Sequence, residues 1–292
     1  MLLVYKRSFL ERRRTELRLA GPIPRSERGR IEAADRENQR TLRHVRDELA
    51  ARGLRVDMVY RGVLSVRKKY DLVVTVGGDG TFFLASHAVE STPVLGVNSD
   101  PDHSLGLHCG ADRRTLSRVL DQVLRGTAPV VRLARLAIFV NGRRVRAYAV
   151  NDVLFASPNP ALMSRYDLSI DGGPAERQRS SGVWFCTASG STAGTYAAGG
   201  RPMPLASRRM QYVVREPYGW PRRPRWLRGF WTKRAELRCE MDAGAAWIDG
   251  SRRRIDLALG DRVVIRAGAP PLTVLNLDDA RRRRLFSPRR DA

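Results

Sequence analysis

The segment that most constrains the fold is an apolar, largely β-branched run, Leu72 to Val76, which leads into the glycine-rich sequence GGDGT at 77–81. A continuous apolar run of this kind predicts a strand that is buried on both faces, and residues 82–89 fit a helix. A strand that enters a glycine turn and then a helix is typical of α/β folds with a parallel sheet. We therefore expect such a sheet in the N-terminal part of the chain.

The pattern changes near the middle of the chain. Up to Gly126, strands alternate with amphipathic helices, which predicts an α/β domain with a mostly parallel sheet at 1–127. The strands are predicted at 2–5, 54–60, 72–76 and 93–97, the helices at 31–52, 82–89 and 113–124, and a turn at 22–30. After Gly126, strand-like segments alternate with turn signals, and 146–156 is predicted as one strand. We expect a mainly-β C-terminal domain at 128–270 and a C-terminal segment at 271–292 with a basic tail.

The net charge of +23 admits two interpretations. A strongly basic protein attracts polyanions, and the tryptophans among arginines at 220–231 are the one candidate for base stacking. However, 49 of the 53 basic residues are arginine and only four are lysine, and the arginines spread along the whole chain. That distribution favours a compositional bias over a nucleic-acid footprint. We expect no specific nucleic-acid partner.

Apolar runs and cysteines indicate the cellular setting. The apolar N-terminal run, Met1 to Tyr5, is too short for a signal-peptide core, and no later run could cross a bilayer. Three isolated cysteines, Cys109, Cys186 and Cys239, form no zinc pattern and fit free, mostly buried thiols. We expect a soluble cytoplasmic protein with no membrane partner.

The GGDGT segment has the properties of a phosphate-binding turn. Glycines let the backbone approach a phosphate closely, and the N-terminus of the following helix offers free N–H groups to the same anion. A carboxylate inside the turn, Asp79, would repel phosphate, but it could accept a proton from an attacking hydroxyl or hold a metal ion. The alternative is an ordinary strand–helix turn in which Asp79 is a cap.

Three further polar clusters interrupt apolar segments. Asn98 follows a predicted buried strand, at the end of a sheet where ligands bind in α/β folds. Asn151 and Asp152 stand inside an apolar strand, where an unpartnered carboxylate would be costly. A small-residue stretch, 186–194, contains hydroxyls that could contact ribose or phosphate, although it could equally be a packing turn.

These four motifs, in this order and spacing, resemble the NAD kinase family over about Leu72 to Leu275. The GGDGT segment alone is shared with diacylglycerol and sphingosine kinases, whereas the Gly-Ser-Thr-Ala stretch at 190–193 is typical of NAD kinases. The resemblance implies an ATP-dependent kinase that phosphorylates the 2′-hydroxyl of the adenosine ribose of NAD or NADH. It also implies an active site between the two domains, a C-terminal segment that returns to the first domain, and a homodimer or homotetramer.

The resemblance assigns roles to particular residues. Asp79 matches the catalytic aspartate, with ATP and a divalent cation, Mg²⁺, as cofactors and no direct protein cage for the metal. The phosphate- and nucleotide-binding residues are Gly77, Gly78, Gly80, Thr81 and Asn98. The acceptor-binding residues are Asn151, Asp152, Ser181, Ser191, Thr192 and Ala193. The histidines His87, His103 and His108 fit structural or supporting roles.

Departures from the usual family pattern resemble the branch that contains plant NADH kinase and animal mitochondrial NAD kinase. Asp152 replaces a glutamate, Ser181 an aspartate and Gly194 a tyrosine. Loss of a carboxylate at 181 would weaken attraction for the charged oxidised nicotinamide, and Gly194 would leave space for the reduced ring. The alternatives are a lipid kinase that shares the GGDGT segment, for which no amphipathic membrane anchor is visible, and a basic nucleic-acid-binding protein.

Overall fold

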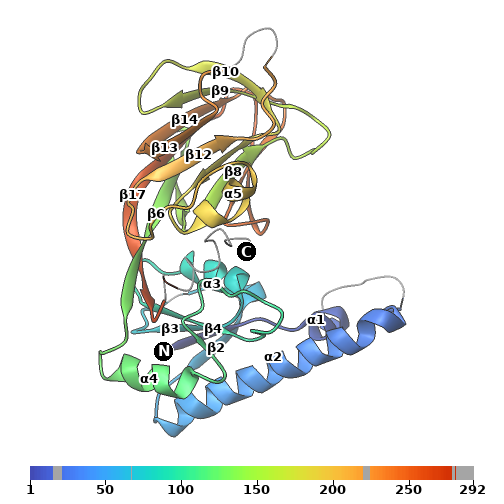
Figure 1. The fold of residues 1–292 in the computed structure, drawn as a ribbon, viewed down its shortest axis with the longest axis vertical. Coiled ribbons are helices and arrows are strands. Elements are labelled where there is room, and N and C mark those ends of the chain that lie inside the picture. Colours follow the sequence, from blue (N-terminus) through green and yellow to red (C-terminus); the bar gives the residue numbers. More distant parts are fainter. Residues whose placement is uncertain (16–21, 67, 220–223, 278–279, 281–292) are drawn as a thin grey trace, which may run out of the picture. The chain divides into compact units, whose positions relative to one another are not determined.

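The computed structural model describes residues 1–15, 22–66, 68–219, 224–277 and 280. These residues form two units, one of Met1–Val131 with a segment that begins at Thr273, and one of Arg132–Leu272. The first unit consists of helices and a parallel sheet, and the second of antiparallel strands in two sheets (Figure 1). Trp220, Arg222, Arg223 and most of the predicted basic tail lie outside the described residues.

The N-terminal unit is built on a parallel sheet. Its strands run in the order β4-β3-β1-β2, and every pairing among them is parallel. The bounds are β1 (Leu2–Tyr5), β2 (Asp57–Tyr60), β3 (Val73–Gly77), β4 (Val94–Asn98) and the short β5 (Ala111–Asp112), which pairs with β4. The last residues of β17 (Arg262–Leu275) add a parallel pairing of Val274 with Val94. The predicted α/β domain with a parallel sheet is confirmed.

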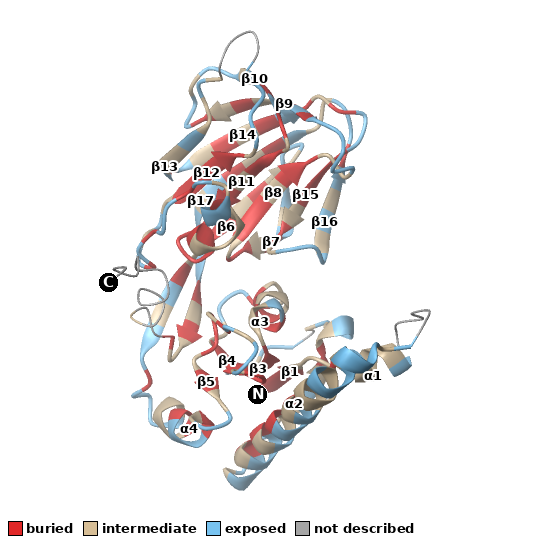
Figure 2. Cartoon of the chain, turned by 45° about the vertical axis from the view of Figure 1, so that its right-hand side comes forward, coloured by how far each residue is buried: buried red, intermediate tan, exposed pale blue. Residues whose placement is uncertain are grey.

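Helices cover this sheet, and the longest begins earlier than the sequence predicts. They are α1 (Phe9–Thr15), α2 (Arg25–Ala51), α3 (Asp79–Ser86), α4 (Leu116–Leu124) and the 3₁₀ turn η1 (Arg61–Val63). Residues 25–30, predicted as part of a turn, are helical; Pro24 is the N-cap residue, and its carbonyl accepts the N–H of Arg28 at 3.2 Å. Thr41, Val45 and Leu49 of α2 are buried (Figure 2).

The C-terminal unit contains antiparallel strands in two sheets. One sheet runs in the order β13-β12-β11-β8-β15-β16, and the other contains β10-β9-β14-β17 together with β6 and β7. The first consists of β8 (Asp152–Ala156), β11 (Val183–Cys186), β12 (Met210–Val214), β13 (Arg228–Thr232), β15 (Gly244–Ile248) and β16 (Arg253–Leu257). The second adds β6 (Val130–Val140), β7 (Arg143–Ala149), β9 (Ser164–Ile170), β10 (Glu176–Ser180) and β14 (Arg234–Cys239). The predicted mainly-β domain is confirmed.

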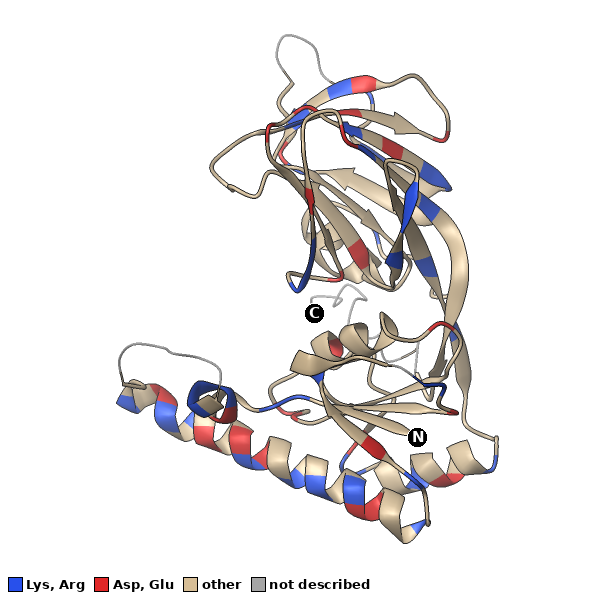
Figure 3. Cartoon of the chain, turned by 180° about the vertical axis from the view of Figure 1, so that it is seen from behind, with Lys and Arg blue, Asp and Glu red and all other residues tan. Residues whose placement is uncertain are grey.

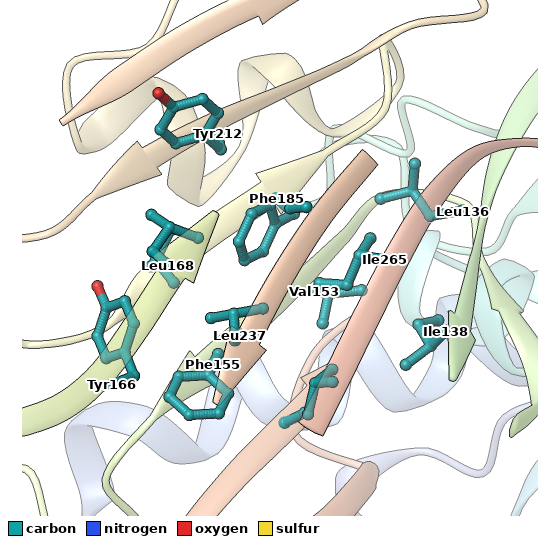
Figure 4. Packing of buried hydrophobic residues seen from close by; sticks show 14 of the residues in the cluster. Leu136, Ile138, Val153, Phe155, Tyr166, Leu168, Phe185, Tyr212, Leu237 and Ile265 are labelled. Carbon is teal, nitrogen blue, oxygen red and sulfur yellow. The ribbon is translucent and has the colours of Figure 1, made fainter. Parts of the chain in front are cut away.

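Side chains from both sheets of this unit form its core. Phe155 and Phe185 of one sheet lie in the same buried cluster as Tyr166, Leu237 and Ile265 of the other (Figure 4). Tyr166 and Phe155 pack edge to face with ring centroids 5.2 Å apart. Apolar burial of this extent is the main stabilising contribution to such a sandwich.

One strand prediction in this unit is wrong. Residues 146–156 were predicted as a single strand, but the chain forms β7 and β8, which belong to different sheets. The break falls at Val150 and Asn151, where the backbone turns from one sheet to the other. An apolar pattern continues through this turn because both strands are buried, so periodicity alone conceals the break.

Lys and Arg are distributed over both units, and α2 carries both signs of charge (Figure 3). Among the described residues, no helix is both long enough and apolar enough to cross a membrane.

Candidate functional site

The GGDGT segment forms the connection from β3 into α3. Helix α3 begins at Asp79, with Gly78 in extended conformation just before it. A Cβ atom on Gly77 would lie only 2.3 Å from the hydroxyl oxygen of Thr81, so glycine is required there. The first turn of a helix has N–H groups that no intrahelical carbonyl can accept. The segment therefore offers backbone donors and a positive dipole end to an anion.

The Asp79 carboxylate is held by residues of the loop after β4. It accepts hydrogen bonds from the backbone N–H groups of Leu107 (3.1 Å) and His108 (2.8 Å), and His108 Nδ1 lies 2.9 Å from Asp79 Oδ1. The His108 ring in turn stacks on Phe82 and meets Phe83 edge-on, at centroid distances of 5.1 and 4.7 Å. The Asp79 side chain is still 30% exposed, which leaves it accessible to a substrate.

The ionisation of Asp79 follows from these contacts. Burial alone would raise the pKa of the Asp79 carboxyl, but the hydrogen bonds and the charge interaction with His108 outweigh it and hold the pKa below its ordinary value. Asp79 is therefore a carboxylate at neutral pH. It can accept a hydrogen bond from an approaching hydroxyl and attract a developing positive charge.

Two other predicted nucleotide-binding residues are fixed beside this segment. The Asn98 side chain donates to the Ser104 carbonyl at 2.8 Å, and it accepts from the Asp100 N–H at 3.1 Å. The buried Thr81 hydroxyl accepts a hydrogen bond from Arg61 at 2.8 Å. The role of Arg61 is not visible in the sequence, because no motif surrounds it along the chain.

The acceptor residues Asn151 and Asp152 lie at the break between β7 and β8. There the Asp249 carboxylate accepts hydrogen bonds from the backbone N–H groups of Val150 (2.9 Å), Asn151 (2.7 Å) and Asp152 (2.9 Å). The Asn151 side chain donates to Asp152 Oδ2 at 3.0 Å. Along the chain Asp249 precedes Gly250, a pair typical of a hairpin turn, so the sequence alone does not reveal this contact.

Asp152 has an unusual environment for a carboxyl group. Its side chain is only 5% exposed. Burial first, and the nearby negative charge of Asp249 second, raise the pKa of Asp152 to about 8, while the hydrogen bond from Asn151 opposes the shift. Asp152 is therefore largely protonated at neutral pH, and it can both donate and accept hydrogen bonds.

The small-residue stretch packs directly against Asn151. It forms the 3₁₀ turn η2 (Gly190–Thr192) and the short helix α5 (Gly194–Ala197). A Cβ atom on Gly190 would lie 2.1 Å from the Asn151 carbonyl oxygen, so only glycine permits this approach. The Thr187 N–H donates to the same carbonyl at 3.0 Å. The structure thus brings the 187–193 stretch together with Asn151 and Asp152.

Comparison with known proteins identifies the chain. Residues 25–127 match the family model of the ATP-NAD kinase N-terminal domain. The probable NADH kinase of Oryza sativa subsp. japonica is 33% identical in an alignment 237 residues long that covers 70% of each chain. The NADH kinase of Arabidopsis thaliana is 32% identical in an alignment 228 residues long that covers 70% of this chain and 72% of its own length.

The chain belongs to the NAD kinase family. Two solved structures have the same fold. An NAD kinase from Archaeoglobus fulgidus in complex with ATP aligns with a TM-score of 0.67 at 20% identity and covers 98% of this chain and 96% of its own. Yeast NADH kinase complexed with NADH aligns with a TM-score of 0.68 at 19% identity, over 81% and 71% of the two chains. At these identities the likeness concerns the fold.

Among the predicted acceptor residues of this NAD kinase family member, Ser191 and Ser181 differ most from expectation. The Ser191 hydroxyl is fully buried, where it donates to the Ala188 carbonyl at 2.7 Å and accepts from the Met203 N–H at 2.8 Å. Ser181 precedes β11, whereas the far end of that strand, Cys186, pairs with Asp152. Five residues of extended chain separate them by roughly 15 Å. Ser181 is not brought together with the other acceptor residues.

The sequence expectation that Gly194 leaves open space is wrong. A Cβ atom at this position would lie 2.9 Å from the ring of Trp184, so the tryptophan fills the space beside the glycine. Thr192 is the last residue of the 3₁₀ turn next to it, and Ala193 is the C-cap of that turn.

The remaining side chains of interest are the potential metal ligands, the cysteines and the histidines. Among the residues that the structure describes, no group of three or more His, Cys, Asp or Glu side chains could hold a metal ion. Cys109, Cys186 and Cys239 are buried thiols that form no disulfide, as predicted. His103 pairs with Asp100 at 2.8 Å, and His108 supports Asp79.

Proposed function

We propose that this protein is an NAD(H) kinase that transfers the γ-phosphoryl group of ATP to the 2′-hydroxyl of the adenosine ribose of NAD or NADH. The observation that carries this proposal is the ionised, partly exposed Asp79 carboxylate inside a glycine turn at the start of a helix. The relatives named NADH kinase support the same reaction. In this reaction the ribose oxygen forms a bond to the γ-phosphorus, the bond from that phosphorus to the β,γ-bridging oxygen breaks, and ADP leaves.

Asp79 acts on the attacking hydroxyl. Phosphoryl transfer depends more on positioning and charge neutralisation than on covalent participation of the protein. Because hydrogen bonds from Leu107 and His108 hold the pKa of Asp79 low, this carboxylate is a weak base. Its main contribution is to orient the 2′-hydroxyl by accepting its hydrogen bond. The hydroxyl proton can pass to Asp79 as the new bond to phosphorus forms.

Asn151 and Asp152 hold acceptor hydroxyls in this proposal. A protonated Asp152 offers both a donor and an acceptor, which suits the vicinal hydroxyls of a ribose. Thr192 and Ala193 contribute from the adjacent turn. The α3 N-terminus and its glycines bind donor phosphate. Mg²⁺ enters with the triphosphate as part of the substrate and neutralises its charge.

The relatives also support a preference among acceptors. The plant proteins at 33% and 32% identity are named NADH kinases, and the yeast protein with the same fold was solved with NADH. We propose that this enzyme uses NADH at least as readily as NAD, and that it acts as a homodimer or homotetramer. Light scattering on the purified protein measures the oligomeric state.

One coupled assay tests the reaction. Purified protein is incubated with ATP, Mg²⁺ and either NAD or NADH, and an NADP-specific dehydrogenase detects the product. NADH as acceptor gives NADPH, which is first oxidised to NADP so that both acceptors give the same signal. Product that requires ATP and an acceptor supports the proposal. Its absence at all protein concentrations, with diacylglycerol or sphingosine phosphorylated instead, would replace it with a lipid kinase.

A further inference from the structure

The outer face of one sheet in the C-terminal unit has a large excess of arginine. The strands of this sheet run in the order β10-β9-β14-β17-β6-β7. Inward residues such as Tyr166 and Leu168 are buried in the core, so the residues between them point outward. The outward arginines are Arg144, Arg146, Arg165, Arg177, Arg179, Arg234, Arg238, Arg262 and Arg266, and the outward acidic residues are Asp167, Glu236 and, just after β14, Glu240. We call this surface the basic face.

The excess on the basic face is not a property of the whole surface. Nine arginines stand beside three acidic residues there, an excess of six positive charges. The long helix α2, by contrast, has seven arginines and six acidic residues. Figure 3 shows this mixture of signs along α2 and basic bands on several strands of the C-terminal unit. A bias toward arginine in the composition explains the number of arginines, but it does not explain why acidic residues accompany them on α2 and not here.

The arrangement of these arginines is unfavourable for the isolated protein. In three places two arginines are direct partners on neighbouring strands, and like charges directly opposite each other destabilise a sheet. The pairs are Arg179 with Arg165, Arg234 with Arg266, and Arg238 with Arg262. A bound polyanion would remove this repulsion.

The acidic residues of the basic face are already engaged. Ion pairs join Arg234 to Glu236 at 2.6 Å, Arg238 to Glu240 at 3.5 Å and Arg177 to Asp167 at 3.5 Å. Within the described part of the chain, five arginines of this face form no ion pair with an acidic side chain: Arg144, Arg146, Arg165, Arg179 and Arg266. Their charges are therefore available to an external anion.

The aromatic rings of the basic face are covered. The Arg266 guanidinium lies over the Phe139 ring and the Arg144 guanidinium over the Tyr148 ring, each 5.0 Å from the ring centroid. Proteins that bind single-stranded nucleic acid stack bases on open aromatic rings, and these two rings are not open. Six strands about 4.8 Å apart span roughly 24 Å. A broad sheet face without open rings suits an extended anionic surface better than a nucleic-acid strand.

An apolar segment adjoins one end of the basic face. Leu162 and Met163, in the connection from β8 to β9, are 60% and 45% exposed. They line a surface hollow of about 590 Å³ together with Arg165 and Arg179. Asp242 is the one acidic residue among the residues that line it. Exposed apolar side chains beside arginines are the combination that peripheral membrane proteins use, since the chains enter the headgroup region while the cations contact lipid phosphates.

We propose that the basic face binds the surface of an anionic phospholipid membrane, with Leu162 and Met163 inserted among the headgroups. A second copy of the chain is a poor occupant, because the same face on two copies would bring two positive surfaces together. The proposal goes beyond the kinase function and does not depend on it. It departs from the sequence expectation of no membrane partner, which considered only signal-peptide and bilayer-spanning runs. A face assembled from six strands contains no such run.

The test measures sedimentation of the full chain with vesicles of phosphatidylcholine alone or with about 30% phosphatidylserine. The charge variant is Arg179→Glu/Arg266→Glu. Each new carboxylate lies opposite an arginine, Arg165 or Arg234, so thermal stability should not fall. The matched control is Arg40→Glu/Arg43→Glu, which makes the same change in charge at two exposed positions of α2.

The apolar contact has its own pair of variants. Leu162→Ser removes an apolar side chain beside the basic face, and Leu124→Ser is the control, because Leu124 is 47% exposed at the end of α4. We expect Leu162→Ser to bind phosphatidylserine vesicles at least threefold more weakly and Leu124→Ser to bind as the wild type does. Unchanged binding by Leu162→Ser would overturn the insertion of this segment.

We expect the wild type to bind phosphatidylserine vesicles at least tenfold more tightly than phosphatidylcholine vesicles at low salt, and Arg179→Glu/Arg266→Glu to lose at least tenfold. The α2 control should stay within twofold. An equal loss in the α2 control would overturn the proposal, because net charge and not this face would then drive binding. No binding of the wild type to phosphatidylserine vesicles would also overturn it. Binding of a duplex or single-stranded oligonucleotide through Arg179 and Arg266, without vesicle binding, would replace the membrane with nucleic acid.

Discussion

Asp249 Oδ1 lies 2.7 Å from the backbone nitrogen of Asn151, and the same carboxylate accepts from the N–H groups on either side. The Asp249 N–H completes the contact by donating to the Asp152 carbonyl at 2.9 Å. These hydrogen bonds satisfy three donors that the break between β7 and β8 leaves without a strand partner. Asp249 thereby fixes the backbone that carries both acceptor residues.

Asp249→Asn should weaken the fold and the acceptor site together. An asparagine keeps one carbonyl oxygen but places an amide NH₂ against backbone N–H groups, so at least one donor is left unsatisfied. The expected loss is about 1–3 kcal/mol in the free energy of unfolding, with a higher KM for the dinucleotide. Urea unfolding and steady-state kinetics measure these two effects.

Asp256→Asn is the control for this change, because Asp256 lies on the neighbouring strand with a side chain that is 77% exposed. It should change the free energy of unfolding by less than about 0.5 kcal/mol. If Asp249→Asn behaves like Asp256→Asn, the carboxylate does not position the Asn151 backbone.

Asp79→Asn should remove most turnover in a protein that still folds, although the amide NH₂ would face the N–H of Leu107 or His108 and lower the free energy of unfolding by about 1–3 kcal/mol. The substitution removes the negatively charged carboxylate that accepts a hydrogen bond from the 2′-hydroxyl of the substrate. Loss of such a group lowers kcat by roughly 10²–10⁴-fold. The control is Asp102→Asn, an aspartate in the loop after β4 with 68% side-chain exposure. Near-wild-type kcat in Asp79→Asn would mean that Asp79 is only a structural cap.

Asp152 should make stability depend on pH. Its pKa rises from 3.8 to about 8 in the folded protein, so between these values the folded state holds a proton that the unfolded state has released. Stability therefore falls as pH rises through this window, by at most about 1.4 kcal/mol per pH unit, and levels off above pH 8. Asp152→Asn resembles the protonated form and should remove this contribution.

The measurement compares urea unfolding of the two proteins from pH 5 to pH 9. The wild type should lose stability relative to Asp152→Asn up to about pH 8, and the difference should then stay constant. Parallel stability curves over the whole range would show that Asp152 is ionised in the folded protein at neutral pH.

Local sequence was sufficient to predict the parts of the site that are contiguous in the chain. The GGDGT segment is recognisable because its strand, turn and helix start occupy adjacent residues, and each requires particular residue types. Asn98 was predicted for the same reason, at the end of a continuous apolar strand. The α/β and mainly-β halves followed from the change in periodicity near Gly126.

Contacts between distant residues could not be predicted. Asp249 is 98 residues from Asn151, and Asp-Gly at this position looks like any hairpin turn. The start of α2 at Arg25 depends on a proline that reads equally well as a turn signal. The Trp184 ring fills the space beside Gly194 only because β11 and α5 pack together. Each of these outcomes depends on tertiary structure that a single sequence does not contain.

The acceptor preference provides the last prediction: kcat/KM for NADH should equal or exceed that for NAD. Oxidised nicotinamide carries a positive charge that an acidic site would favour, and this chain has Ser181 where the family usually has an aspartate. The structure removes one argument for this preference, because Trp184 occupies the space beside Gly194. It also weakens the charge argument, because Ser181 is separated from Asp152 by the length of β11.

A carboxylate restored at this position tests the remaining argument. At roughly 15 Å, a unit charge in water contributes only about 0.3 kcal/mol, which is less than a twofold change in affinity. Ser181→Asp should therefore leave the ratio of the two kcat/KM values within twofold of wild type. A tenfold preference of the wild type for NAD, about 1.4 kcal/mol, would contradict the predicted use of NADH. A tenfold shift toward NAD in Ser181→Asp would mean that residue 181 contacts the nicotinamide. That result would contradict the separation of Ser181 from Asp152 along β11.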